Sequence, residues 1–554
     1  MKSSEGKPVI FGHLGKRADF IGERLANVYG KVPDAARVIA KSVGVMYAVG
    51  GGFKRGAASE DHATWLWSTG YVPTSENEVV EDFDHISLEV DAKNAVLSGS
   101  QSGTLPLYLV ESKDGLTFSS NLDLLIKSKN TPLKPDYVGL GEMVAASGPF
   151  NGRTTVAGIQ RVQPGEVFHV DTAGAIKREN KWLWPGITPN GGKVGAVREA
   201  LWEHIRTVTR GQDVVSMLSG GWDSRLLLAA AFHIGMPTSV AGYTTSSDTG
   251  TVMEELVAAQ VANHLNIDHH IAFPERSHFP TDFREFGAAV DYQTAFHVWL
   301  MPLLRAVKNQ YTGNDTDQPR PVALDGLGGG LFIGSSFSDE GRSNDVKEGR
   351  LRGITRYLNR ESNVLRPEVA NNIREQIRAE AEPIIDDFLK HPYGHTLSAY
   401  VARTLPGISH APHSLISETA NIATPFVASS VVEAALQMPV TAHRDDQLYG
   451  QLLNEIDPFL ARLTTAQEQV PWPRPHPRRI TAIEVVHELR KLVNAEPVKQ
   501  LVKKEFLRAT DEEWQRALAK TADQHIIRGL AMLSLWHERY REFFSSFDLG
   551  SVYR

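Results

Sequence analysis

The spacing of apolar residues changes about a third of the way along the chain. Up to residue 185, short stretches alternate between apolar and polar residues, as in 86–90 and 166–170, and turn-forming residues separate them. This alternation predicts a β-rich region. After residue 194, short apolar runs alternate with stretches in which apolar residues recur every three or four positions. Strands that alternate with helices predict a doubly wound parallel sheet with helices on both faces.

We place the first region at 1–185 and the second at 194–554, with a linker rich in glycine and proline between them. In the second region we expect, in order, a helix at 196–209, a strand at 214–218, a helix at 223–234, a strand at 239–243, a helix at 252–265, strands at 270–273 and 321–324, and mostly helices from 339 to 403 and after 479. Ligands of such sheets bind at the carboxyl ends of the strands. Glycine-rich segments lie at two of these ends, at 219–224 and 325–329.

Length and composition describe an ordinary globular protein of more than one domain. The chain has 554 residues, which is too many for one compact core. The formal net charge is -7, so there is no overall basic field and we expect no nucleic-acid partner. No apolar run approaches the roughly 20 residues that span a bilayer, and the first residues do not lead into a signal-peptide core. We therefore expect a cytoplasmic protein without a membrane partner.

The chain contains no cysteine. Disulfides, thiolate metal sites, iron–sulfur clusters and cysteine nucleophiles are therefore excluded.

The segment from Ser219 to Ser224 has the features of a phosphate-binding loop. It follows an apolar strand and opens a helix, so its backbone N–H groups face outward, and glycine lets phosphates approach closely. Asp223 is a carboxylate beside the expected polyanion, which indicates a divalent cation between them. The loop has no Gly-Lys-Ser/Thr and is not a Walker motif.

The sequence Ser-Gly-Gly-Trp-Asp-Ser at 219–224 resembles the pyrophosphate loop of the asparagine synthetase superfamily. The strand at 239–243, the second loop at 325–329 and the segment at 424–439 also resemble that superfamily, so the similarity covers about 194–463. Its members split ATP into AMP and pyrophosphate and activate a carboxylate as an acyl-adenylate. The resemblance therefore implies ATP and Mg²⁺ as cofactors.

The resemblance also implies which residues bind the nucleotide and the metal. The nucleotide-binding residues would be Leu218, Ser219, Gly220, Gly221, Asp223, Ser224, Gly242, Tyr243, Gly326, Gly328 and Gly329. Asp223 and Asp325 would bind the metal. The superfamily usually has a magnesium-binding aspartate after the second loop, where this chain has Gly330. Asp325, Asp339 or Glu340 would supply the missing carboxylate, or Asp223 and ATP oxygens would hold Mg²⁺ alone.

The first region resembles the glutaminase domain of the same superfamily, through the segments 103–108, 118–120 and 158–165. That domain is an N-terminal-nucleophile αββα sandwich in which a cysteine at position 2 attacks glutamine. This chain has Lys2 at that position. We therefore predict a degenerate sandwich without glutaminase activity.

Without ammonia from glutamine, we expect the amine that attacks the acyl-adenylate to belong to the substrate. Two branches of the superfamily work in this way, the β-lactam synthetases and the lasso peptide cyclases, and an asparagine synthetase-like enzyme using free ammonia is a third possibility. At the position of Leu327, asparagine synthetases have a glutamate and β-lactam synthetases a tyrosine. Leucine neither accepts a proton nor donates a hydrogen bond, which argues against both of these small-molecule branches.

The loop sequence with Leu327 most resembles the lasso peptide cyclases, which join a peptide's N-terminal amine to an Asp or Glu side chain. This likeness implies a precursor peptide as substrate, with a leader peptidase and a leader-binding recognition protein as partners. An inactive scaffold that binds nucleotide or peptide is a further alternative, because both Lys2 and Gly330 depart from the superfamily pattern.

Candidates for further catalytic roles lie late in the chain. Arg444, together with His443 and a basic segment at 474–479, is a candidate to neutralise the leaving pyrophosphate, since no late lysine matches the family. His410 and His413 are candidates for the base that deprotonates the incoming ammonium, alongside a structural role. Asp291 and His297 are candidates for a wall of the site, although a structural role is favoured for His297.

Overall fold

The computed structural model describes residues 7–30, 32, 37–40, 43–58, 62–72, 82–129, 131–246, 252–311, 320–334, 345–469 and 478–553. Lys2, Asp339, Glu340 and Arg474 lie outside these residues. None of the described helices is both long and apolar enough to cross a membrane.

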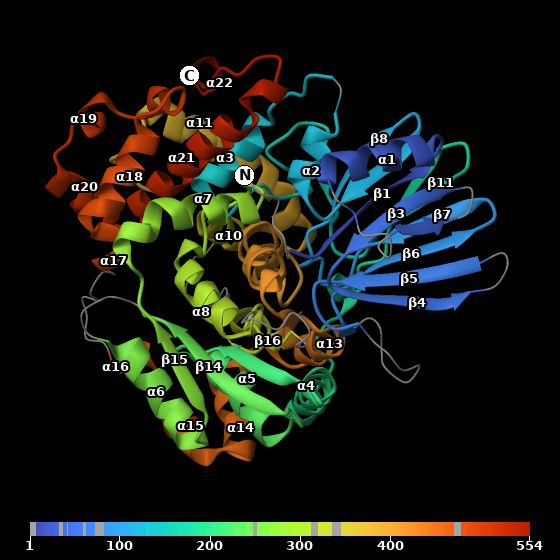
Figure 1. The fold of residues 1–554 in the computed structure, drawn as a ribbon. Helices are drawn as coiled ribbons and strands as arrows, with labels where there is room; N and C mark the ends of the chain where they lie inside the picture. Colours follow the sequence, from blue (N-terminus) through green and yellow to red (C-terminus); the bar gives the residue numbers. More distant parts are fainter. Residues whose placement is uncertain are drawn as a thin grey trace.

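The N-terminal part forms two six-stranded antiparallel sheets that stack face to face (Figure 1). The first has the order β10-β8-β9-β1-β3-β2, with bounds β1 Val9–Gly15, β2 Arg37–Ala40, β3 Gly44–Val49, β8 Tyr108–Ser112, β9 Gly115–Ser119 and β10 Gln160–Arg161. The second has the order β12-β11-β7-β6-β5-β4, with bounds β4 Gly52–Ala58, β5 His62–Ser68, β6 Ile86–Asp91, β7 Asn94–Ser98, β11 Glu166–Asp171 and β12 Ile176–Asn180.

Alternation of side chains along the strands builds the core between these sheets. Trp67 and Leu97 of the second sheet pack with Phe118 of the first, and all three are buried. Helices α1 (Ala18–Tyr29) and α2 (Leu122–Lys127) cover the outer face of the first sheet. The predicted sandwich of stacked antiparallel sheets is confirmed.

A five-stranded parallel sheet forms the centre of the second region, with the order β15-β14-β13-β16-β17. Its strands are β13 Asp213–Met217, β14 Ser239–Thr245, β15 Asp268–Ala272, β16 Val322–Leu324 and β17 Asn421–Ala423. Helices α5 (Trp222–His233) and α6 (Met253–Leu265) lie on one face, and α8 (Met301–Tyr311) packs on β14 and β15 from the other (Figure 1). The doubly wound parallel sheet is confirmed.

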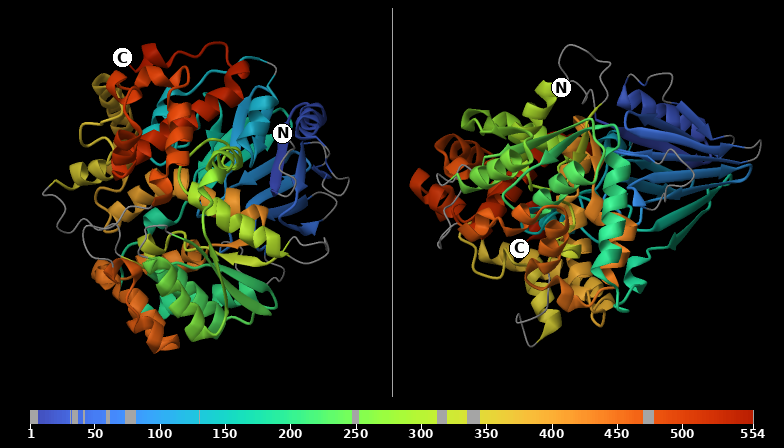
Figure 2. Two further views of the ribbon diagram at one scale, coloured as in Figure 1. Left: turned by 60° about the vertical axis from the view of Figure 1, so that its left-hand side comes forward. Right: turned by 90° about the horizontal axis from the view of Figure 1, so that it is seen from below.

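The remaining helices pack around the two regions (Figure 2). The longer ones are α3 Tyr137–Ala145, α4 Val194–Thr209, α7 Phe279–Ala289, α10 Val346–Ile354, α11 Pro367–Asp387, α13 Ser429–Leu436, α14 Gln447–Ile456, α18 Ile483–Val493, α20 Asp511–Leu518 and α21 Thr521–Tyr540. Short helix α12 (Gly394–Ala399) continues as the π-helical stretch Tyr400–Ile408, and a second π-helical stretch follows at Ala411–Leu415. Helix α3 of the N-terminal region packs against α11 and α21, so one hydrophobic core runs through both regions.

Candidate active site

The predicted phosphate loop connects β13 to α5 at the carboxyl end of the parallel sheet. The Ser219 amide donates a hydrogen bond to Ser224 Oγ at 2.9 Å, and the two hydroxyl oxygens lie 3.0 Å apart. The amide of Gly221 donates to Ser219 Oγ at 3.2 Å. The two serines therefore hold the turn closed by bonds within the loop. They fix its backbone at the helix N-terminus, where an anion is favoured.

One backbone amide of the loop already donates to a carboxylate. Gly220 N lies 2.7 Å from Glu254 Oε2, which comes from the first turn of α6. This contact shows that a backbone amide of the loop can donate to an anionic oxygen.

Asp223 belongs to the first glycine-rich loop, and its side chain lies against the second one. Burial raises the pKa of its carboxyl to about 6, the Tyr449 hydroxyl opposes the rise by donating to Oδ1, and the charges of Asp446 and Asp325 add to it. A β-carbon at Gly329 would lie 2.1 Å from Asp223 Oδ1. The second loop thus needs glycine at this position in order to approach Asp223 closely.

The negative charges of two further carboxylates, those of Asp325 and Asp446, act on Asp223. Asp325 is buried beside the second loop, and burial raises the pKa of its carboxyl. Asp446 comes from the turn before α14, and a β-carbon at Gly334 would lie 2.9 Å from its Oδ1. Gly334 comes four residues after Gly330. Gly330 is the position at which the superfamily usually has a magnesium-binding aspartate. Asp446 therefore occupies the neighbourhood in which sequence analysis found a carboxylate missing.

Among the described residues, no group of three or more His, Cys, Asp or Glu side chains is arranged so that it could hold a metal ion. Asp223 would therefore be the main protein ligand of a divalent cation such as Mg²⁺ bound together with ATP. Such a cation would offset the charges of Asp446 and Asp325, which disfavour ionisation of Asp223. Few protein carboxylates, completed by phosphate oxygens and water, are typical of Mg²⁺ sites.

The predicted adenine-binding strand lies next to the phosphate loop. Leu218 N donates to Tyr243 O at 2.8 Å, and a β-carbon at Gly242 would lie 3.1 Å from Leu218 Cδ2. The ring of Tyr243 is buried, stacks on His270, and its hydroxyl donates to Gln310. The tyrosine ring is therefore part of the core, and a nucleotide would meet the backbone of Gly242 and Tyr243.

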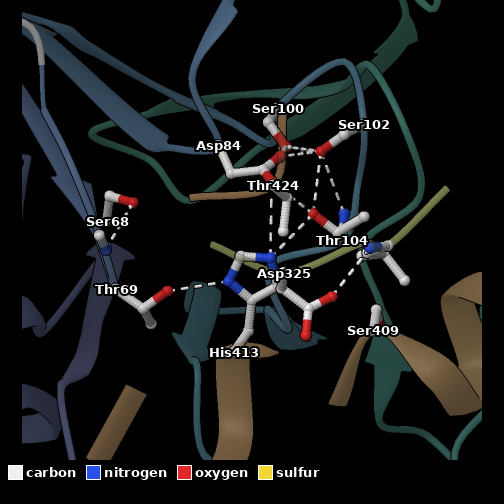
Figure 3. Close-up of polar contacts among 12 residues, drawn as sticks. Ser68, Thr69, Asp84, Ser100, Ser102, Thr104, Asp325, Ser409, His413 and Thr424 are labelled. Atoms are coloured by element: carbon white, nitrogen blue, oxygen red, sulfur yellow. Dashed lines mark hydrogen bonds and ion pairs between the residues drawn. The ribbon is translucent and has the colours of Figure 1, made fainter. Parts of the chain in front are cut away.

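His413 lies in the interface between the two regions, where it contacts Thr69 and Thr104 (Figure 3), and His410 comes three residues earlier in the same segment. The two ring nitrogens of His413 lie 2.9 Å from Thr69 Oγ1 and 3.1 Å from Thr104 Oγ1. Burial and the nearby charge of Arg161 hold the pKa of His410 well below its ordinary value, and its Nδ1 lies 3.0 Å from Ser414 Oγ. Among the described residues, the hydrogen bonds of these two imidazoles go to Thr69, Thr104 and Ser414, and their role as a base stays a prediction.

The other predicted residues also fall in different places. Arg444 is exposed, two residues before Asp446, on the turn that approaches Asp223. His443 is buried and lies 3.3 Å from two backbone carbonyl oxygens, so it is structural in this conformation. Asp291 accepts the Leu122 amide at 3.0 Å in the interface with the N-terminal region.

Tyr449 and Asp446 were not among the residues predicted from the sequence. Both reach Asp223 from α14 and the turn before it, more than 200 residues away in the sequence. The adjacent pair Asp445 and Asp446 in front of a helix was a visible signal, but no recognised spacing links it to the first loop.

The model of the asparagine synthase family matches residues 196–538, more than half of the chain. The chain belongs to the asparagine synthase family. It is accordingly an ATP-dependent, amide-forming synthetase. The match includes both glycine-rich loops and the turn that carries Asp446.

Two solved structures show weak similarity to this family member. One is the glutamine phosphoribosylpyrophosphate amidotransferase from B. subtilis complexed with ADP and GMP, with 10% identity, TM-score 0.20, and coverage of 48% of this chain and 90% of that one. The other is described as the allosteric regulatory enzyme of purine biosynthesis, with 11% identity, TM-score 0.18, and coverage of 49% and 75%. No curated protein matches the chain.

Proposed function

We propose that this asparagine synthase family member is a macrolactam synthetase of the lasso peptide cyclase kind. Its substrate is a precursor peptide whose Asp or Glu side chain becomes joined to the peptide's own N-terminal amine. The observation that supports this choice is the apolar side chain at the tip of the second loop. Leu327 is 4% exposed and offers no side-chain donor or acceptor, while its amide is held by Asp325 Oδ1 at 2.9 Å.

The reaction has two steps. The substrate carboxylate attacks the α-phosphorus of ATP, which forms an acyl-adenylate and releases pyrophosphate. The N-terminal amine then attacks the acyl carbon, forms the amide and releases AMP, and the amine loses a proton. The backbone amides and hydroxyls of the loop at Ser219–Ser224 would bind the pyrophosphate part of ATP. Bound Mg²⁺ would supply neutralisation of the phosphate charge, held by Asp223 with Asp446 or Asp325.

The N-terminal sandwich supplies no ammonia in this proposal. Position 2 is lysine and the chain has no cysteine, so the thiolate attack on glutamine has no nucleophile. The amine then comes from the substrate. Ring closure is an intramolecular step whose main barrier is the entropy of bringing the two ends together, and an enzyme lowers that barrier by holding the peptide folded.

The proposed reaction needs a substrate that other proteins have prepared. A precursor must lose its leader segment before a new N-terminal amine exists. A leader peptidase and a leader-binding protein are therefore the partners that we propose, acting together in the cytoplasm where ATP is abundant.

The experiment incubates the purified protein with MgATP and a matured precursor peptide, and measures AMP by chromatography and peptide mass by spectrometry. We expect AMP and a product that is lighter by one water. Replacing Asp223 by Ala removes the carboxylate between the two loops. The variant should be at least about 1,000-fold slower, because the reaction depends on stabilising the negative charge that develops on the phosphates.

The matched control is Asp445→Asn, since Asp445 is exposed on the turn beside the site, asparagine tolerates its positive φ, and the variant is expected to keep the wild-type rate. Amide formation only with free ammonia, or only on a small amino acid, would contradict the peptide proposal. Absence of AMP with every substrate class would point instead to a scaffold without turnover.

A further inference from the structure

Glu254 contacts the phosphate loop from a neighbouring helix. Its Oε2 lies 2.7 Å from the amide nitrogen of Gly220, and its side chain is half-buried. Glu254 is the second residue of α6, and the adjacent Glu255 is buried and accepts a hydrogen bond from the Ser246 hydroxyl. The two successive acids therefore have different partners, and it is Glu254 that reaches the loop.

The peptide group of Gly220 is held from its other side as well. Its carbonyl oxygen accepts the Ala466 amide at 3.2 Å and a guanidinium nitrogen of Arg225 at 3.4 Å. A β-carbon at Gly220 would lie 2.5 Å from Ala466 Cβ, so the short helix α16 (Ala466–Gln469) packs directly on the loop. Because the carbonyl is held, the N–H group keeps its direction. A new acceptor for this N–H group therefore requires movement of the Glu254 side chain, and not of the loop.

Three successive amides at the start of the loop have acceptors of two kinds. The amides of Ser219 and Gly221 donate to the hydroxyl oxygens of Ser224 and Ser219, which are neutral. The amide of Gly220 donates to a carboxylate. Successive backbone N–H groups form concave sites for anions, but each has one hydrogen to donate. A phosphate oxygen can therefore bind to the Gly220 amide only after Glu254 has left it.

The charge of Glu254 also acts against a polyanion at the loop. Like charges a few ångströms apart repel strongly where protein partly excludes water. In the part of the chain that the structure describes, Glu254 forms no ion pair with a lysine, arginine or histidine that would offset its charge. Pyrophosphate at the loop therefore meets a competitor for one donor and an adjacent negative charge.

We propose that Glu254 takes the place of a phosphate oxygen at the Gly220 amide and competes with pyrophosphate for the loop. The inference rests on the proposed binding of pyrophosphate at 219–224, and it does not depend on which carboxylate is activated. Pyrophosphate that forms together with the acyl-adenylate must leave before the next ATP binds. A carboxylate that returns to the Gly220 amide favours this release, and it also weakens the binding of ATP.

The test measures binding of Mg²⁺-pyrophosphate to the full-length protein by titration calorimetry, with AMP as a second probe. Glu254→Gln removes the charge but keeps an oxygen that can accept from the Gly220 amide, and Glu254→Ala removes both. We expect each variant to bind Mg²⁺-pyrophosphate about tenfold more tightly than the wild type, because a like charge beside the ligand is gone. AMP lacks the pyrophosphate group and should bind with unchanged affinity, which also shows that the variants are folded.

Glu275→Gln is the matched control. Glu275 follows β15 at the carboxyl edge of the same sheet, and its side chain is 69% exposed. The substitution removes one negative charge, as Glu254→Gln does, and should leave the binding of Mg²⁺-pyrophosphate unchanged. An equal gain in affinity in this control would show that overall charge governs binding, and it would overturn the inference.

Weaker or unchanged binding of Mg²⁺-pyrophosphate in Glu254→Gln would also overturn the inference and would assign Glu254 to support of the loop. The probes contain no peptide, so the result is independent of cyclisation. If the Glu254 variants bind pyrophosphate more tightly while no peptide is cyclised, the inference stands and the peptide substrate of the proposed function fails. If pyrophosphate binds to none of the proteins, the assignment of the loop fails together with the inference.

Discussion

At the scale of single residues, the candidate active site is a balance between carboxylates that repel one another and a loop that binds anions. Asp223 is held by the Tyr449 hydroxyl, while the charges of Asp446 and Asp325 disfavour its ionisation. An ionised Asp223 beside these two charges has a cost in stability. Such a cost is typical of a site whose charges are completed by a ligand.

The role of Asp446 can be tested with its neighbour as control. Replacing Asp446 by Asn removes one carboxylate near Asp223 and should raise the Mg²⁺ concentration for half-maximal pyrophosphate release about tenfold. A coupled assay measures pyrophosphate against a Mg²⁺ series. Asp445→Asn is the matched control, since both positions have positive φ and asparagine tolerates that conformation equally well. Identical Mg²⁺ dependence of the two variants would exclude Asp446 as a metal ligand.

Single residues also mark how far the sequence could predict this site. Ser219, Asp223 and Ser224 lie within six positions, so a local pattern was enough to bring them together. Tyr449 reaches Asp223 only through the packing of α14 against α5, which no local spacing encodes. His413 could be singled out by type, but its two threonine partners come from the other region of the chain.

At the scale of helices and strands, hydrophobic periodicity predicted which elements exist better than where they begin and end. The strand expected at 270–273 is β15 at Asp268–Ala272, with its register set by parallel pairing to β14. The apolar run that begins at Leu105 enters its strand, β8, only at Tyr108, because Pro106 has no N–H to donate to a sheet. The close packing of α3 on α21 was not predicted, since the two helices lie far apart in the sequence.

That packing depends on one glycine. A β-carbon at Gly529 of α21 would lie 2.4 Å from the carbonyl oxygen of Val144 in α3. Gly529→Ala should therefore lower the free energy of unfolding by about 1–3 kcal/mol, because overpacking forces the two helices apart. Gly450 of α14 is the matched control, since a β-carbon there meets nothing within 4 Å. Gly450→Ala should raise stability by up to about 1 kcal/mol through helix propensity. Urea unfolding followed by circular dichroism measures both, and a stabilised Gly529→Ala variant would contradict the packing argument.

At the scale of the whole molecule, the N-terminal sandwich is tied to the synthetase region by one buried polar network. Asp84, at the entry to β6, accepts hydrogen bonds from Thr104 Oγ1 at 2.7 Å and from Thr424 Oγ1 at 2.8 Å, and its Oδ2 lies 3.4 Å from His413 Nε2 (Figure 3). Thr424 directly follows β17, beside the strand that leads to the second glycine-rich loop. The sandwich, which contains no cysteine, thus supports the active-site loops.

Asp84→Asn is expected to loosen this connection and to change its response to acid. Burial alone would raise the pKa of Asp84, but hydrogen bonding and charge from His413, with bonds from Thr104 and Thr424, outweigh burial and hold the pKa below its ordinary value. A depressed carboxyl pKa stabilises the fold above the pKa of the unfolded chain, and the contribution is lost as the pH falls through the folded pKa. At pH 7 the variant should therefore be about 2–4 kcal/mol less stable than the wild type, and at about pH 3 the difference should shrink. Asp91→Asn, at an exposed turn of the same sheet, should cost less than about 1 kcal/mol at both values. Urea unfolding at the two pH values measures the differences, and a pH-independent loss in Asp84→Asn would show that shape, rather than charge, joins the two regions.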